Sequence, residues 1–294
     1  MITIKAKTKT TFFGIALLLP SLAVLALLFV TPLVNMLATS FTNQNLLRPD
    51  RLDFIAFENY IWMFTDSIFW ETLGRTLIFT ASVTVISIVV SMLLSLLLNM
   101  EFPGKRIVFA LLLLPWVTSF MSSAFIFTLL YDFSFGVFNY LLSFLGIGPQ
   151  VWLGQLNTAL GSVILVSVWH FLPFSILVLT NALKQVPEEL LESARLDGAG
   201  GWRAFFAITI PVIKPALITL TIVRIAASFR AFDSIFLLTR GGPGTATTTL
   251  PLWYHQIGFQ SFRAGRGASV GVIMVLVVLL IYFTLIKTYG DEAV

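Results

Sequence analysis

The feature that most constrains this chain is a series of six long apolar segments with few charged side chains. A helix needs about 20 mostly apolar residues to cross the hydrocarbon core of a bilayer. Within lipid, a spanning segment must satisfy its own backbone hydrogen bonds, which a helix does. We therefore predict an all-α membrane protein with a single membrane domain over residues 1–294. Its six transmembrane helices are expected at residues 12–37, 73–98, 107–130, 159–183, 216–238 and 268–286.

The composition excludes several classes of protein. Of the 294 residues, 57% are hydrophobic and 11% are charged, whereas an average soluble domain carries about 25% charged residues. The chain has no cysteine for disulfides or thiolate metal sites, and its two histidines lack metal-ligand spacing. It contains no P-loop motif for ATP and no triad or carboxylate pair for catalysis. We therefore expect no cofactor and no enzymatic activity.

The basic residues of the connecting segments predict the orientation of the chain, because lysine and arginine accumulate in cytoplasmic loops. This bias also accounts for the net charge of +4 without a nucleic-acid partner. With the N-terminus inside, six basic residues lie in the outer segments, at positions 48, 51, 75, 240, 263 and 266. Ten lie in the cytoplasmic segments, at positions 5, 7, 9, 105, 106, 184, 195, 203, 214 and 287. We predict that both termini are cytoplasmic.

The longest polar cytoplasmic segment is expected at residues 186–215. Pro187 and two glutamates favour a helix start, and Gly198 favours its end. A second short helix is expected at residues 202–210, with Pro211 and Pro215 at the entry to the next span. Small residues at the tip would let another backbone approach closely. The residues alone leave two interpretations open, a docking site for a partner and an amphipathic loop on the membrane surface.

A gapped motif in this loop resembles a known family. Glu192-Ser193-Ala194, Gly198 and Ile208-x-Ile210-Pro211 are similar to the EAA motif of ABC importer permeases, with Ser193 and Ile210 as departures. The first helix, the FENY segment and the LTRGGP segment resemble the six-span, MalF-like type of maltose-type carbohydrate permease. The resemblance implies the type I ABC importer permease fold and a coupling helix that contacts an ATPase. The implied contact residues are Glu192, Ser193, Ala194, Asp197, Gly198 and Ala199.

The resemblance also implies partners and a location. The partners would be a second permease subunit, two ATP-binding cassette subunits that hydrolyse ATP, an extracytoplasmic substrate-binding protein and membrane lipid. The location would be the cytoplasmic (inner) membrane of a bacterium or archaeon. The transported solute would be a sugar or a sugar-like compound, such as a di- or oligosaccharide, a polyol or a glycerol phosphate.

The fourth and fifth apolar segments hold the candidate solute pathway. Ionisable residues inside spans are functional candidates because their burial is costly, and helical spacing places Arg224 on a stripe with small residues. The motifs W-x-x-x-P and F-x-x-F…LTxGGP resemble the helices that line the sugar site in maltose-type permeases. The implied pathway residues are Ser167, Phe171, Phe174, Arg224, Ala227, Ser228 and Ala231.

Alternatives remain open at this point. The aromatic side chains could serve helix packing, Arg224 could cap a neighbouring helix, and Arg230 and Asp233 could simply neutralise each other. A permease for a solute that is not a sugar and a secondary transporter are the other functional classes. A secondary transporter would need coupling-ion carboxylates or internal repeats, and the sequence offers only Asp233 and no visible repeat.

Overall fold

The computed structural model of the protein describes residues 17–289, so the first five residues of the predicted first span lie outside it. This part of the chain is helical, and its only β pairing is an isolated bridge between Thr42 and Phe54. Five of its helices are long and apolar enough to cross a membrane, or six if one bent pair is counted as a span. The apolar helices cover Leu17–Ser40, Ser67–Asn99 (α4), Ala159–Leu183 (α8), Gly201–Phe229 and Ala264–Tyr289 (α14).

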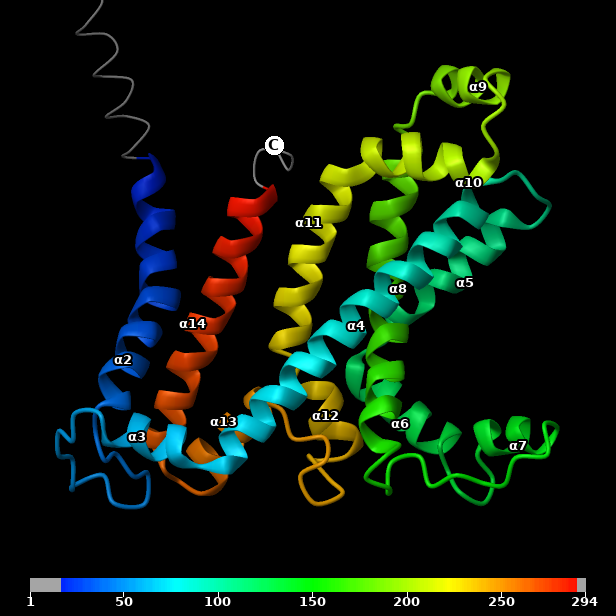
Figure 1. Cartoon of the computed structure of the whole chain (residues 1–294). Coiled ribbons are helices and arrows are strands. Elements are labelled where there is room, and N and C mark those ends of the chain that lie inside the picture. The colour runs from blue at the N-terminus through cyan, green and yellow to red at the C-terminus, as the bar shows by residue number, and fades with distance from the viewer. Residues whose placement is uncertain (1–16, 290–294) are drawn as a thin grey trace, which may run out of the picture. The chain divides into compact units, whose positions relative to one another are not determined.

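Figure 1 labels most of the helical elements of the chain. Three elements are π-helical turns, in which each backbone hydrogen bond joins two residues five positions apart: η1 (Ala26–Val30), η2 (Phe205–Thr209) and η3 (Gln256–Gln260). The remaining helices are α2 (Thr31–Ser40), α3 (Glu58–Thr65), α5 (Lys105–Val117), α6 (Phe120–Leu130), α7 (Val137–Ser143), α9 (Glu188–Leu196), α10 (Gly201–Ala204), α11 (Ile210–Phe229), α12 (Asp233–Leu238) and α13 (Leu250–His255).

The segment expected to form one span at residues 107–130 is bent. It consists of α5 and α6, whose axes differ by 105°. Pro115 lies in the last turn of α5, and the hydroxyl of Ser119 caps α6 by accepting a hydrogen bond from the backbone N–H of Ser122. Proline removes a backbone donor, and a serine cap starts a new helix. These residues account for a break that the hydropathy pattern does not reveal.

The fifth span also differs from the prediction for residues 216–238. α11 ends at Phe229, and a separate short helix, α12, covers the last six residues of the predicted span. At the other end, α10, η2 and α11 form one continuous helix that starts at Gly201, so Pro211 and Pro215 do not interrupt the entry. The π-helical turn η2 directly precedes Pro211, and such a local π adjustment accommodates the backbone groups that a proline inside a membrane helix leaves without partners.

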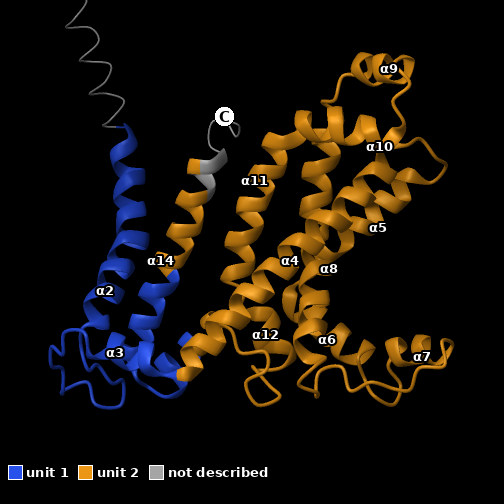
Figure 2. Cartoon of the chain, in the orientation of Figure 1, with its two compact units in different colours: residues 1–66, 254–274 blue, residues 67–253, 275–294 orange. Residues whose placement is uncertain are grey.

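The chain divides into two compact units (Figure 2). Unit 1 contains the described residues up to Asp66 together with residues 254–274, and unit 2 contains residues 67–253 with the described residues from Val275 onward. Unit 2 holds α4, α8 and α11, and α4 packs most extensively against α8. The expectation of a single domain over residues 1–294 stays a prediction.

Buried hydroxyl side chains line one stripe of α4. They recur at intervals of three or four residues, which places them on one helix face, and Ser95 donates a hydrogen bond to the carbonyl oxygen of Ile176 in α8 at 3.2 Å. Small polar residues let membrane helices approach closely, and the α8 side of the contact also buries Ser167 and Ser175. We call this stripe the hydroxyl seam: Thr72, Thr76, Thr80, Thr84, Ser87, Ser91 and Ser95.

A substitution in the seam tests this packing. Ser87 is fully buried, so Ser87→Leu would insert a larger side chain into the seam and destabilise the protein by about 1–3 kcal/mol. Val85 lies on the same helix but is 59% exposed, so Val85→Leu is the matched control and should change little. The measurement is the thermal unfolding midpoint of the purified chain in detergent. Equal midpoints for the two variants would show that the seam is not tightly packed.

Candidate functional site

The loop at residues 186–215 presents α9 as a short helix outside the long apolar helices (Figure 1). Pro187 is extended at its N-cap, and Glu188 and Glu189 occupy its first turn, as the sequence predicts. Its end is a Schellman motif, because the backbone N–H of Ala199 bonds to the carbonyl of Ala194 and that of Gly198 bonds to Arg195. Gly198 has a φ of +77°, which glycine adopts without strain.

The Schellman motif shows how the six predicted coupling residues are arranged. Ala194 is the buried residue of α9. The backbone N–H groups of Gly198 and Ala199 form the hydrogen bonds that end the helix. Glu192, Ser193 and Asp197 are exposed and are therefore free to meet another surface. Their role as contacts to an ATPase stays a prediction.

Two large apolar side chains of this loop were not among the predicted contact residues. Leu196, the last residue of α9, is 89% exposed, and Trp202 in α10 is 75% exposed. Their exposure depends on the Schellman turn and on the start of the next helix at Gly201, which fix where each side chain points. The sequence does contain a signal for this exposed apolar surface, because two large apolar residues lie on either side of a glycine-rich turn.

Two of the predicted pathway residues, Phe171 and Arg224, meet where α8 and α11 pack together in unit 2. Nη1 of Arg224 in α11 donates a hydrogen bond to the carbonyl oxygen of Phe171 in α8 at 3.2 Å, and the guanidinium lies 4.3 Å from the centre of the Phe171 ring. Pro173 lies inside α8 near this carbonyl. Arg224 is 2% exposed, which makes it the one buried charged side chain between residues 17 and 289. A backbone carbonyl and a π face thus hold a cation that makes no ion pair in this range.

Hydrogen-bonding capacity remains unused around Arg224. Its Nε, the hydroxyl of Ser228 one turn further along α11 and Nδ1 of His170 are buried without a protein partner. Buried polar atoms normally have a partner, so these atoms could serve a polar solute. Ser167 is different, because its hydroxyl bonds to the carbonyl of Val163 in its own helix.

An aromatic cluster surrounds the bend between α5 and α6. Phe120 lies 4.4 Å from His170 between ring centroids, and Trp116 makes an edge contact with Phe174 at 6.0 Å. Phe174 was a predicted pathway residue, whereas Trp116 and Phe120 were not, because both were read as part of an unbroken span. The bend brings them to the same part of α8 as the Arg224 contact.

The remaining predicted pathway residues divide between two elements. Ala227 is half-buried within α11, whereas Ala231 lies beyond the helix end and packs against the cluster formed by Phe79, Val83 and Val163. The predicted stripe is therefore interrupted at Phe229. Arg230 and Asp233 are both exposed, and the described residues form no ion pair between them.

The glycine cluster after α12 forms a closed turn. The hydroxyls of Thr239 and Thr247 lie 2.6 Å apart, and Thr247 and Thr248 donate hydrogen bonds to the carbonyl oxygens of Gly242 and Gly241. The turn is tied to α4, because the backbone N–H of Leu250 bonds to the hydroxyl of Thr76 at 2.8 Å. The threonine-rich stretch thus builds the turn itself.

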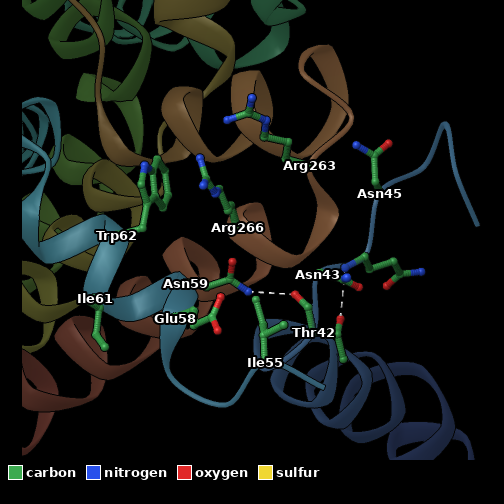
Figure 3. A pocket seen from close by; sticks show the side chains of 11 residues that line it. Thr42, Asn43, Asn45, Ile55, Glu58, Asn59, Ile61, Trp62, Arg263 and Arg266 are labelled. Atoms are coloured by element: carbon green, nitrogen blue, oxygen red, sulfur yellow. Dashed lines mark hydrogen bonds between the residues drawn. The ribbon is translucent and has the colours of Figure 1, made fainter. Parts of the chain in front are cut away.

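Unit 1 contains a polar pocket of about 610 Å³ (Figure 3). Arg266 lies over the ring of Trp62 at 4.4 Å, and Arg263 also lines the pocket. The sequence analysis predicted no site here, because the pocket joins residues about 200 positions apart in the chain. Its walls come from residues 42–45, residues 55–62 and the start of α14.

The pocket wall depends on one close backbone contact. Asn59 donates hydrogen bonds to the carbonyl oxygens of Ser40 and Thr42 at 2.8 Å each, and the backbone N–H of Gly265 bonds to Gln44. A Cβ atom at Gly265 would overlap the carbonyl oxygen of Thr42 and approach Asn59. Only glycine fits at this position without a shift of the backbone.

This contact predicts different effects for two glycine substitutions. Gly265→Ala should destabilise the protein by about 1–3 kcal/mol, because backbone atoms must move to admit the methyl group. A Cβ atom at Gly161 in α8 would meet no other atom within 4 Å, so Gly161→Ala should be neutral or stabilising by up to about 1 kcal/mol. Thermal unfolding of the full chain in detergent, followed by tryptophan fluorescence, measures both. A Gly265→Ala midpoint at or above that of Gly161→Ala would contradict the observed wall.

Comparison with known proteins gives a consistent picture. Residues 8–292 match the family model described as binding-protein-dependent transport system inner membrane component. The chain is 33% identical to the sulfoquinovosyl glycerol transport system permease protein SmoG of Agrobacterium fabrum, over 94% of this chain and 90% of that protein. It is 31% identical to the trehalose/maltose transport system permease protein MalF of Thermococcus litoralis, over 97% and 95%.

The fold is also found in a solved structure. A bacterial ABC transporter involved in the import of the acidic polysaccharide alginate contains a chain that superposes with a TM-score of 0.84. The two chains are 22% identical, and the match covers 99% of this chain and 100% of that one. The predicted ABC importer permease fold is confirmed.

Proposed function

This chain belongs to the family of binding-protein-dependent transport system inner membrane components, and we propose that it is one of two permease subunits of an ABC importer for a sugar or sugar-like solute. The observation that carries the proposal is α9, a short helix closed by a Schellman motif, with Leu196 at its end 89% exposed. Leaving a large apolar side chain in water is unfavourable, and a partner that covers it gains the free energy of its burial. A partner ATPase accounts for this surface.

In the proposed mechanism the chain performs no catalysis. Two ATP-binding cassette subunits close on ATP and displace α9 through Glu192, Ser193, Leu196 and Asp197. Since α10, η2 and α11 form one helix, displacement of the loop moves the helix that carries Arg224. Each permease subunit contributes half of the solute pathway. The pathway then opens toward the extracytoplasmic substrate-binding protein.

The solute class follows from the chemistry around Arg224 and from the relatives. A buried guanidinium beside an aromatic ring and unused hydrogen-bonding atoms can hold sugar hydroxyls or an anionic group. Another relative, 33% identical over 90% of this chain, is the sn-glycerol-3-phosphate permease protein UgpA of Yersinia pestis. We therefore propose a di- or oligosaccharide, a polyol or a glycerol-phosphate-like solute. Mass spectrometry of the ligand that co-purifies with the cognate binding protein would identify it, and a ligand outside these three classes would favour a permease for a solute that is not sugar-like.

The ATPase contact is tested by substituting Leu196. Because its side chain is almost fully exposed, Leu196→Ser should leave the unfolding midpoint unchanged but reduce co-purification of the ATPase at least tenfold, because burying a leucine side chain at an interface is worth about 2 kcal/mol. Leu156 is 68% exposed beyond the opposite end of α8, and Leu156→Ser is the matched control. Undiminished ATPase recovery with Leu196→Ser would remove the proposed anchor.

The pathway is tested at Arg224. Arg224→Gln keeps a polar side chain but removes the cation, so solute uptake by the reconstituted importer should fall at least tenfold while the complex still assembles, because charge-assisted hydrogen bonds are worth about 1.5–3 kcal/mol each. Arg230→Gln removes an exposed positive charge just beyond the same helix and should leave uptake within about twofold, as surface charges contribute about 1 kcal/mol or less. Unchanged uptake and transport-coupled ATPase activity in Arg224→Gln would exclude the pathway role.

A further inference from the structure

A second polar pocket lies in unit 2, away from the Arg224 site. It measures about 420 Å³ and is formed where the end of α4, the start of α5 and the end of α8 meet. Three cationic side chains line it, namely Lys105, Arg106 and Lys184, together with the carboxylate of Glu101. The pocket therefore collects more positive than negative charge.

The charges in the pocket are not equivalent. Lys105 forms an ion pair with Glu101 at 2.8 Å, and this contact lowers the pKa of Glu101, which is therefore ionised at neutral pH. Arg106 and Lys184 make no ion pair within the part of the chain that the structure describes. After the neutralised pair is set aside, two cations remain for an anion.

A buried hydroxyl also faces this space. Thr180, one turn before Lys184 on α8, lines the pocket and is 7% exposed, and its hydroxyl has no hydrogen-bond partner in the structure. A buried hydroxyl without a partner is unusual. A ligand with oxygen acceptors would satisfy it at the same time as the two cations.

The surroundings of the pocket are apolar. Leu98, Phe109 and Leu177 also line it, together with the polar Asn181. Beside the cationic residues, α5 exposes Ile107 and Leu111, at 68% and 58%. Cations at the end of spanning helices beside exposed apolar surface are the arrangement that binds the headgroups of anionic lipids.

We propose that this pocket binds a phosphate group, with Arg106, Lys184 and Thr180 as its ligands, and that an anionic phospholipid supplies the phosphate. The placement of the pocket on the cytoplasmic side of the membrane rests on the proposed function, in which the loop that carries α9 meets an ATPase. Lys184 caps α8 only four residues before α9 begins. A bound headgroup would therefore hold the start of the coupling loop in place.

Native mass spectrometry of the purified full chain tests the proposal, with dioleoylphosphatidylglycerol as the probe and dioleoylphosphatidylcholine as the neutral comparison. Two cations near a headgroup contribute about 1 kcal/mol each, so the double variant Arg106→Gln/Lys184→Gln should bind phosphatidylglycerol at least tenfold more weakly. The double variant Arg195→Gln/Arg203→Gln removes the same charge from two exposed positions on the same predicted side and should bind as the unmodified chain does. Thr180→Val keeps the size and the charges and should weaken binding severalfold.

The outcomes separate the sources of the phosphate. Binding that inorganic phosphate displaces at millimolar concentration would support the phosphate site and point to a soluble ligand, whereas binding that resists phosphate would support the lipid. Equal losses in the two double variants, or equal binding of the two lipids by the unmodified chain, would overturn the proposal. The readout needs neither solute nor ATPase, so it stands apart from the uptake and co-purification tests of the proposed function.

Discussion

The close approach of α4 to α8 is the contact on which the packing of unit 2 depends. Lipid is as apolar as a leucine side chain, so apolar surface alone does not hold membrane helices together, and small or hydroxyl-bearing residues provide the attraction by close packing. The hydroxyl seam runs from Thr72 to Ser95 along α4 and ends in a hydrogen bond to α8. Because α11 also packs on both helices, the seam fixes the frame in which Arg224 reaches Phe171.

The Arg224 contact shows what this frame makes possible. A buried guanidinium is costly unless its donors are satisfied, and here one donor meets a backbone carbonyl while the charge lies over an aromatic ring. Pro173 in α8 has no N–H, so the carbonyl of Trp169, four residues earlier, lacks its usual helical donor. Arg224 bonds to a different carbonyl, that of Phe171, which lies two residues before the proline, where such a helix can bend.

Much of the fold could be predicted from the sequence because spanning helices have to be long and apolar. The limits of α8 are the predicted ones at both ends. The bend between α5 and α6 could not be predicted, since its causes, Pro115 and the Ser119 cap, lie within a run whose hydropathy stays high. The end of α11 at Phe229 was missed for a different reason: the charged residues Arg230 and Asp233 follow it, but the apolar residues of α12 then continue the segment. The start of α9 at Pro187 and its end at Gly198 could be predicted, because their signals lie within a few residues of each other in the sequence. The pockets in units 1 and 2 could not, since their walls come from segments far apart in the chain.

The continuous helix from Gly201 to Phe229 has a mechanical consequence. Figure 1 shows that this helix changes direction between α10 and the long part of α11, so its two parts lie along different axes. Bending is easiest where the backbone ladder lacks donors, at Pro211 and Pro215. Under the proposed mechanism, a displacement of α10 would therefore reach Arg224 through the turn between α10 and α11, and the stiffness of this turn would set how far Arg224 moves.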